Sequence, residues 1–90
     1  MDSSEFFAQL EIEFEMDIPA GDQARMESMR DIRDYVHAIY RERGIVMPAV
    51  AIFERLRRST ASVLELDSAT IKPETKLSEF HLTTPKRAWF

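Results

Sequence analysis

The chain contains no cysteine and only two glycines among its 90 residues. Without cysteine it can form no disulfide bond and no thiolate metal site, and it has no cysteine nucleophile. Two glycines are too few for a glycine-rich phosphate-binding loop. No apolar run approaches the roughly 20 residues that a membrane-spanning helix needs, so we expect no membrane insertion. Residues 1–5 lack the basic and apolar regions of a signal peptide, and we therefore expect a cytoplasmic protein.

Basic residues are also absent before Arg25, and charge is divided unevenly along the chain. Residues 1–40 carry ten acidic side chains against three basic ones, whereas residues 41–90 carry six acidic against nine basic. An acidic half of this kind repels nucleic acid, so we expect no nucleic-acid partner. The charge favours either a basic protein partner or a solvated acidic helix surface.

Apolar residues recur at helical spacing in three stretches, which predicts three main helices. Local signals mark several of their ends: Asp2 and the two serines after it can cap the first helix, and Ser28 with Asp31 forms a capping box before the second. Gly44 suits a left-handed cap after the second helix, and Pro48 suits the first turn of the third. The three apolar stripes are Phe6, Phe7, Leu10 and Phe14; Met29, Ile32, Val36, Ile39 and Tyr40; and Ala49, Ile52, Phe53, Leu56, Thr60 and Val63.

The remaining segments are short. We expect a turn over residues 20–22 followed by a brief helix over 22–26, and a loop over 67–77 anchored by apolar residues. Thr84 followed by Pro85 has the pattern of one more helix start. No segment alternates like a strand, so the sequence predicts an all-α fold, a small bundle of three to four helices forming a single domain over residues 1–90.

Catalytic and metal-binding patterns are weak. His37 and His81 lie in different predicted elements, and neither has a nucleophile nearby. Glu11, Glu13 and Glu15 occupy alternate helix positions, so their carboxylates diverge and do not converge on one ion. Arg55, with two further arginines close behind it, predicts a small solvated basic cluster. We therefore expect neither a metal site nor an enzyme.

The first 43 residues follow the order of a known family. An acidic helix runs into an Ile-Pro step, a short helix follows, and a final helix contains Asp-Tyr-Val. This order resembles the second half of acyl carrier proteins, whose final helix ends Asp-Tyr-Ile. The matching residues are Glu5-Phe6, Leu10-Glu11, Phe14, Ile18-Pro19, Met26, Met29 and Asp34-Tyr35-Val36.

Residues 49–84 resemble the first half of the same family. Residues 52–57 are similar to its opening helix, and residues 63–67 are similar to its Val-Leu-Gly-Val-Asp exit, with Glu65 at the glycine position. Residues 71–77 are similar to its Ile-Thr-Pro-Asp-Thr-x-Leu loop. The two halves stand in reversed order, which implies a circularly permuted carrier fold. A domain swap between two chains, giving a monomer or a swapped dimer, and a fragment spanning two tandem domains are the alternatives.

The attachment motif of the family is degenerate in this chain. Acyl carrier proteins attach 4′-phosphopantetheine to the serine of an Asp-Ser-Leu motif at the start of the acidic helix. Aligned through the loop, Thr84 replaces that serine and His81 replaces a family glycine. Asp2-Ser3 supplies the dipeptide about one helical turn late. The resemblance makes Ser3 a candidate attachment residue; the alternative is that Asp2, Ser3 and Ser4 only cap the helix.

What the resemblance implies is an acyl-carrier-like protein rather than an enzyme. Its acidic helix would dock onto a basic patch of an acyltransferase, synthase or ligase in fatty-acid, polyketide or peptide biosynthesis. The alternative functions are an adaptor without a prosthetic arm and a structural or self-associating module that reuses the fold. The residues expected to dock are Glu5, Glu11, Glu13, Glu15 and Asp17.

Overall fold

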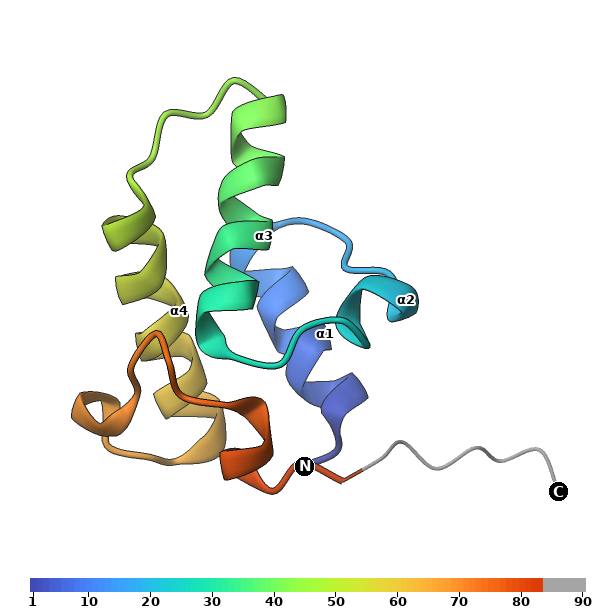
Figure 1. The fold of residues 1–90 in the computed structure, drawn as a ribbon, viewed down its shortest axis with the longest axis vertical. Helices are drawn as coiled ribbons and strands as arrows, with labels where there is room; N and C mark the ends of the chain where they lie inside the picture. The colour runs from blue at the N-terminus through green and yellow to red at the C-terminus, as the bar shows by residue number, and fades with distance from the viewer. Residues whose placement is uncertain (84–90) are drawn as a thin grey trace, which may run out of the picture.

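The computed structural model describes residues 1–83, so the helix start predicted at Thr84 lies outside the described residues. The described part is helical and contains no β-strand, which confirms the expected small all-α bundle (Figure 1). Its elements in chain order are α1 (Ser3–Phe14), α2 (Ala20–Gln23), α3 (Met29–Glu42), α4 (Ala49–Leu64) and the short 3-10 helices η1 (Ser68–Thr70) and η2 (Leu77–Phe80).

Local hydrogen bonds cap helix α1 at both ends. The carboxylate of Asp2 accepts the N–H of Glu5 at 2.7 Å, as expected of a cap. At the other end Glu15 takes a left-handed conformation with φ of 52°, and the N–H of Met16 returns to the carbonyl of Glu11. The apolar stripe faces inward, and all four of its predicted residues are buried.

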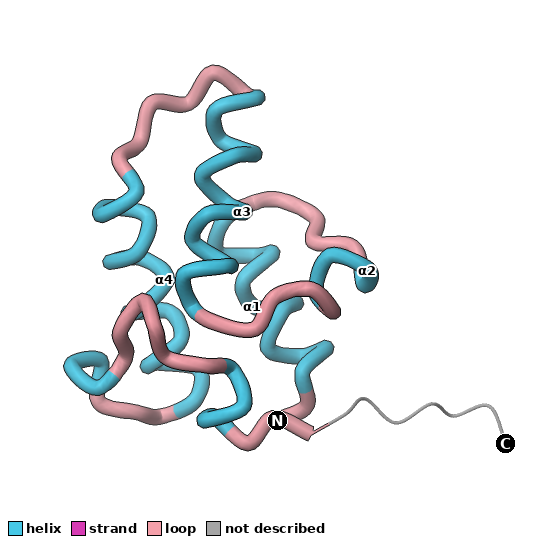
Figure 2. The backbone as a smooth tube through the Cα atoms, viewed as in Figure 1, coloured by secondary structure: helices cyan, strands magenta, loops and turns pink. Residues whose placement is uncertain are grey.

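Helices α3 and α4 form an antiparallel pair joined by the connector of residues 43–48 (Figure 2). The predicted capping box is present before α3: Ser28 Oγ accepts the N–H of Asp31, and the Asp31 carboxylate accepts the N–H of Ser28 at 3.0 Å. Gly44 has the predicted left-handed backbone, with φ of 74°. Pro48 is the residue before α4 and not part of its first turn.

Two sequence predictions about short elements are wrong. Helix α2 spans Ala20–Gln23, so the residues expected to form a turn are helical and the helix does not continue to Met26. The cause is Pro19, whose ring fixes φ near −56° and whose carbonyl accepts the N–H groups of Asp22 and Gln23, each at 2.9 Å. Within the loop expected over residues 67–77, Ser68–Thr70 form the 3-10 helix η1, and η2 begins at the last residue of that loop, Leu77.

One apolar cluster joins the three long helices, α1, α3 and α4, with the segments between them. Helix α1 contributes three phenylalanine rings and a leucine, and α3 and α4 contribute mainly aliphatic side chains together with Tyr40 and Phe53. Ile71 fills the cluster from the loop after η1, as expected of an apolar anchor. Residues of both halves of the chain therefore share one core. The cluster consists of Phe6, Phe7, Leu10, Phe14, Met16, Ile18, Met26, Met29, Ile32, Val36, Tyr40, Ile52, Phe53, Leu56 and Ile71.

The beginning of α1 lies beside the end of the described chain (Figure 1). The N–H of Ser3 donates to the carbonyl of Thr83 at 2.9 Å, and the N–H of Thr83 donates to the carbonyl of Met1 at 3.3 Å. A second link ties the loop to the turn before α3, because the N–H of Leu77 donates to the carbonyl of Glu27 at 2.8 Å. The bonds of Thr83 with Met1 and Ser3 therefore join the two ends of the described chain.

Candidate functional site

Ser3 is the first residue of α1, directly after the capping residue Asp2. Its side chain is half-buried at the edge of a hollow of about 590 Å³ that lies between the first turn of α1, helix α2 and η2. Phe7 and Leu82 line the hollow with apolar surface, and Ser4 adds a second hydroxyl. The predicted candidate residue therefore stands at a helix start beside a partly apolar space.

A hydrogen bond between α2 and α3 holds one wall of this hollow. The hydroxyl of Tyr35 donates to a carboxylate oxygen of Asp22 at 2.9 Å. Burial raises the pKa of Tyr35, and the bond to the Asp22 carboxylate raises it further because it stabilises the protonated phenol. Helix α2 has only four residues, so this side-chain bond helps to keep it in place against α3.

The five acidic residues expected to dock a partner fall into two groups. Glu5, Glu15 and Asp17 are exposed, and none of them forms an ion pair within residues 1–83. Glu11 and Glu13 are half-buried and have partners inside the molecule. The Glu11 carboxylate accepts the N–H of Ile18 at 2.7 Å, which closes the turn after α1. The exposed group is the part of the predicted docking set that is directly accessible to a partner.

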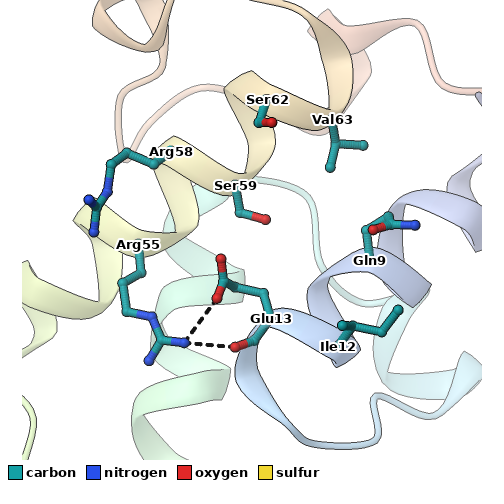
Figure 3. Close-up of a pocket in the computed structure, with 8 residues that line it drawn as sticks. All are labelled: Gln9, Ile12, Glu13, Arg55, Arg58, Ser59, Ser62 and Val63. Atoms are coloured by element: carbon teal, nitrogen blue, oxygen red, sulfur yellow. Dashed lines mark hydrogen bonds and ion pairs between the residues drawn. The ribbon is translucent and has the colours of Figure 1, made fainter.

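Glu13 connects α1 to α4 across a groove. Figure 3 draws the residues that line this groove. The guanidinium of Arg55 donates to the Glu13 carbonyl at 2.7 Å and to its carboxylate at 3.0 Å. The same guanidinium lies 5.1 Å from the centre of the Phe14 ring. The hydrogen bond to Glu13 raises the pKa of Arg55. Arg55 is therefore only partly solvated, with 32% of its side chain exposed, because α1 supplies both an acceptor and an aromatic face.

The groove beside this pair has a volume of about 600 Å³ and walls of mixed chemistry. Helix α1 contributes Gln9 and Ile12, while α4 contributes Ser59, Ser62 and Val63 (Figure 3). Ile12 is 71% exposed, although it is a large aliphatic residue. Sequence reasoning missed Ile12. A signal was present, since Ile12 lies seven residues after Glu5 and therefore on the same polar helix face.

Metal and histidine chemistry find no further support in the structure. Residues 1–83 contain no group of three or more histidine, aspartate or glutamate side chains placed to hold a metal ion. His37 lies half-buried in α3, and His81 is exposed after η2. Within the same residues, no helix combines the length and the apolar character needed to cross a bilayer.

Comparisons of this chain with protein-family models, with curated proteins and with solved structures give no match. The candidate site is therefore defined from the sequence and structure of this chain alone. These are Ser3 at the start of α1, and the exposed face of α1 and its following turn, with Glu5, Ile12, Glu15 and Asp17.

Proposed function

We propose that this chain is a carrier-like docking protein, related to acyl carrier proteins by circular permutation. Its acidic helix α1 would bind a basic patch on an acyl- or aminoacyl-handling enzyme of the acyltransferase, synthase or ligase class. The observation that carries the proposal is the pairing of Thr83 with Met1 and Ser3. The segment that resembles the first half of the family ends there, and the segment that resembles the second half begins there. A circular permutation requires this adjacency.

The backbone at two substituted glycine positions supports the same relationship. Glu65 and His81 stand where the family pattern has glycine, and their φ angles are 56° and 55°. Glycine adopts this left-handed region without penalty, whereas other residues adopt it rarely. Within residues 1–83 only one other non-glycine residue, Glu15, has a positive φ. The alignment therefore places family glycines at two of the three positions where the backbone favours them.

The proposed docking surface consists of Glu5, Glu15 and Asp17 around the exposed side chain of Ile12. Exposed carboxylates on one face attract a basic partner over about a Debye length, which is near 10 Å at 0.1 M salt. Such charges mainly raise the association rate and select the partner, while apolar contacts slow dissociation. The surface is thus suited to salt-sensitive, reversible binding.

The test is a binding titration against a panel of purified acyltransferases, synthases and ligases at 50 mM and 500 mM NaCl. We expect at least one member to bind about tenfold more weakly at the higher salt concentration. Replacing the exposed acids of this surface, in Glu5→Gln, Glu15→Gln and Asp17→Asn combined, should weaken the same complex about tenfold.

The matched control removes the same charge from elsewhere. Glu27, Glu42 and Glu74 are exposed and lie outside α1, so their combined change to glutamine alters the net charge equally. We expect this control to change the affinity less than about twofold. Equal weakening by the two triple variants would show that net charge alone drives binding, and would contradict docking through α1.

A second candidate function is the attachment of 4′-phosphopantetheine to Ser3. The favouring observation is that Asp2-Ser3 stands at the start of the acidic helix, with the Ser3 side chain half-buried at the edge of a hollow that can receive part of an arm. When attached, the group supplies a thiol that carries acyl chains as thioesters. Thr84, the other residue at the motif position, lies outside the described residues.

Intact mass spectrometry before and after incubation with coenzyme A and a broad-specificity phosphopantetheinyl transferase decides between a carrier and an adaptor without an arm. A gain of one phosphopantetheine that Ser3→Ala abolishes and Ser4→Ala preserves assigns the attachment to Ser3. No gain by a protein that circular dichroism shows to be folded leaves the adaptor.

A further inference from the structure

Exposed apolar side chains gather at the connector between α3 and α4, far from the start of α1 (Figure 1). Val46 is 98% exposed and Val50 is 70% exposed, with Ile45 beside them at 40%. Three of the six large apolar residues exposed within residues 1–83 thus belong to this one tip. Isolated exposed apolar residues are common, but a cluster of this kind usually marks a contact surface.

The tip also encloses a hollow of about 450 Å³. Ile45, Val46 and Met47 form its apolar wall, and Arg41 and His37 supply its polar edge. Arg41 is exposed, so the opening carries positive charge beside an apolar interior. An occupant that fits this chemistry presents a branched aliphatic side chain next to carboxylates.

The chain itself carries such a knob. Ile12 protrudes from α1 and is 71% exposed. Glu5 lies two turns before it on the same helix face. Glu15, in the turn that follows α1, lines one shallow hollow together with Ile12. An exposed aliphatic side chain flanked by acids thus complements an apolar hollow with a basic edge, because it protrudes where the hollow recedes and carries the opposite charge.

We propose that a second copy of this chain occupies the hollow, with Ile12 of one copy entering the apolar tip of the next. This inference does not rest on the proposed docking function. Because the knob and the hollow are different surfaces, the contact is heterologous, and each copy can bind two neighbours. The contact area is small, so the association is weak and reversible. It also covers Ile12, so self-association and docking of a basic partner compete for α1.

The test is analytical ultracentrifugation of the full chain at concentrations up to about 1 mM, because a small interface gives weak association that only high concentrations reveal. We expect the weight-average mass to rise with concentration from the 10.5 kDa of one chain to beyond that of two. Ile12→Ser and Val46→Ser should each weaken association about tenfold or more, since each removes an aliphatic group from the contact. Leu66→Ser is the control: Leu66 is 42% exposed at the opposite end of α4 and should leave association unchanged.

An equimolar mixture of the Ile12→Ser and Val46→Ser variants separates this contact from other ways of pairing. The first variant keeps the hollow and the second keeps the knob, so the mixture should associate and stop at two chains. Association of Ile12→Ser alone at wild-type strength would mean that the tip pairs with itself, and overturns the proposal. A wild type that stays monomeric to about 1 mM overturns it as well. If that monomer sediments with phosphatidylcholine–phosphatidylserine vesicles, the tip is instead a lipid-binding surface.

Discussion

Glycine in place of Glu65 should give a more stable protein than alanine does, although glycine has the smaller side chain. Glu65 ends α4 with φ of 56° and ψ of 48°, and its side chain is exposed. A left-handed backbone costs a residue with a Cβ about 1–2 kcal/mol. Glycine avoids this cost but loses about 0.4–1 kcal/mol through the greater freedom of the unfolded chain. The balance favours glycine over alanine by about 1 kcal/mol.

The comparison that isolates the backbone is Glu65→Gly against Glu65→Ala, because both variants lose the same carboxylate. Thermal unfolding followed by far-UV circular dichroism should place the glycine variant about 4–8 °C above the alanine variant. Gly44→Ala is the reciprocal control, because Gly44 has φ of 74° with nothing within 4 Å of an added Cβ, so any loss comes from the backbone alone. If Glu65→Gly is no more stable than Glu65→Ala, the left-handed conformation at this position carries no strain, and the support that it lends to the family relationship is lost.

Three further predictions concern the core, the cap of α3 and the groove. Thr60 is fully buried, and its hydroxyl has no hydrogen-bond partner within the described residues. Thr60→Val should therefore raise the free energy of unfolding by about 1 kcal/mol, while Thr60→Ser lowers it. Urea titrations measure both, and a valine variant that is less stable than the wild type would contradict this. The N–H of Glu27 and the capping bonds of Asp31 hold the pKa of the Asp31 carboxyl below its ordinary value. Its contribution to the free energy of unfolding is therefore complete above that ordinary value and is lost as the pH falls through the lower pKa of the folded state. Asp31→Asn should flatten this acid limb of the stability curve, and an unchanged limb would refute the assignment. A double-mutant cycle on Glu13 and Arg55 should give a coupling of about 0.5–1 kcal/mol, and a coupling near zero would mean that the pair does not stabilise the contact of α1 with α4.

Most of the helices could be predicted because their signals are local. An apolar stripe, a capping residue and a terminating glycine lie within a few positions of the helix that they define, as at Ser28 and Gly44. The sequence predicts the start of helix α2 two residues too late, because a proline such as Pro19 is also a signal that ends the preceding helix. The same residue begins α2, since its fixed φ and free carbonyl suit a helix start.

The candidate site was predictable only in part. Asp2-Ser3 at a helix start and the acidic character of α1 are visible in the sequence, and the structure places them as expected. The division of the acids into exposed and internally bonded groups was not visible. Glu13 finds Arg55 42 positions away, and no local pattern indicates that pairing. The permuted carrier relationship remains a prediction that the closure at Thr83 and the backbone at Glu65 support.

Local sequence signals are enough to predict the helical class, most of the buried positions of the three long helices, most of their ends and the negative charge of α1. These depend on interactions among residues within a turn or two of one another. The tertiary fold is needed to see that Thr83 meets Ser3, that the half-buried Arg55 pairs with Glu13, and that Ile12 and Val46 remain exposed. Each of these outcomes depends on which distant segment packs alongside, and a single sequence carries no local record of that choice.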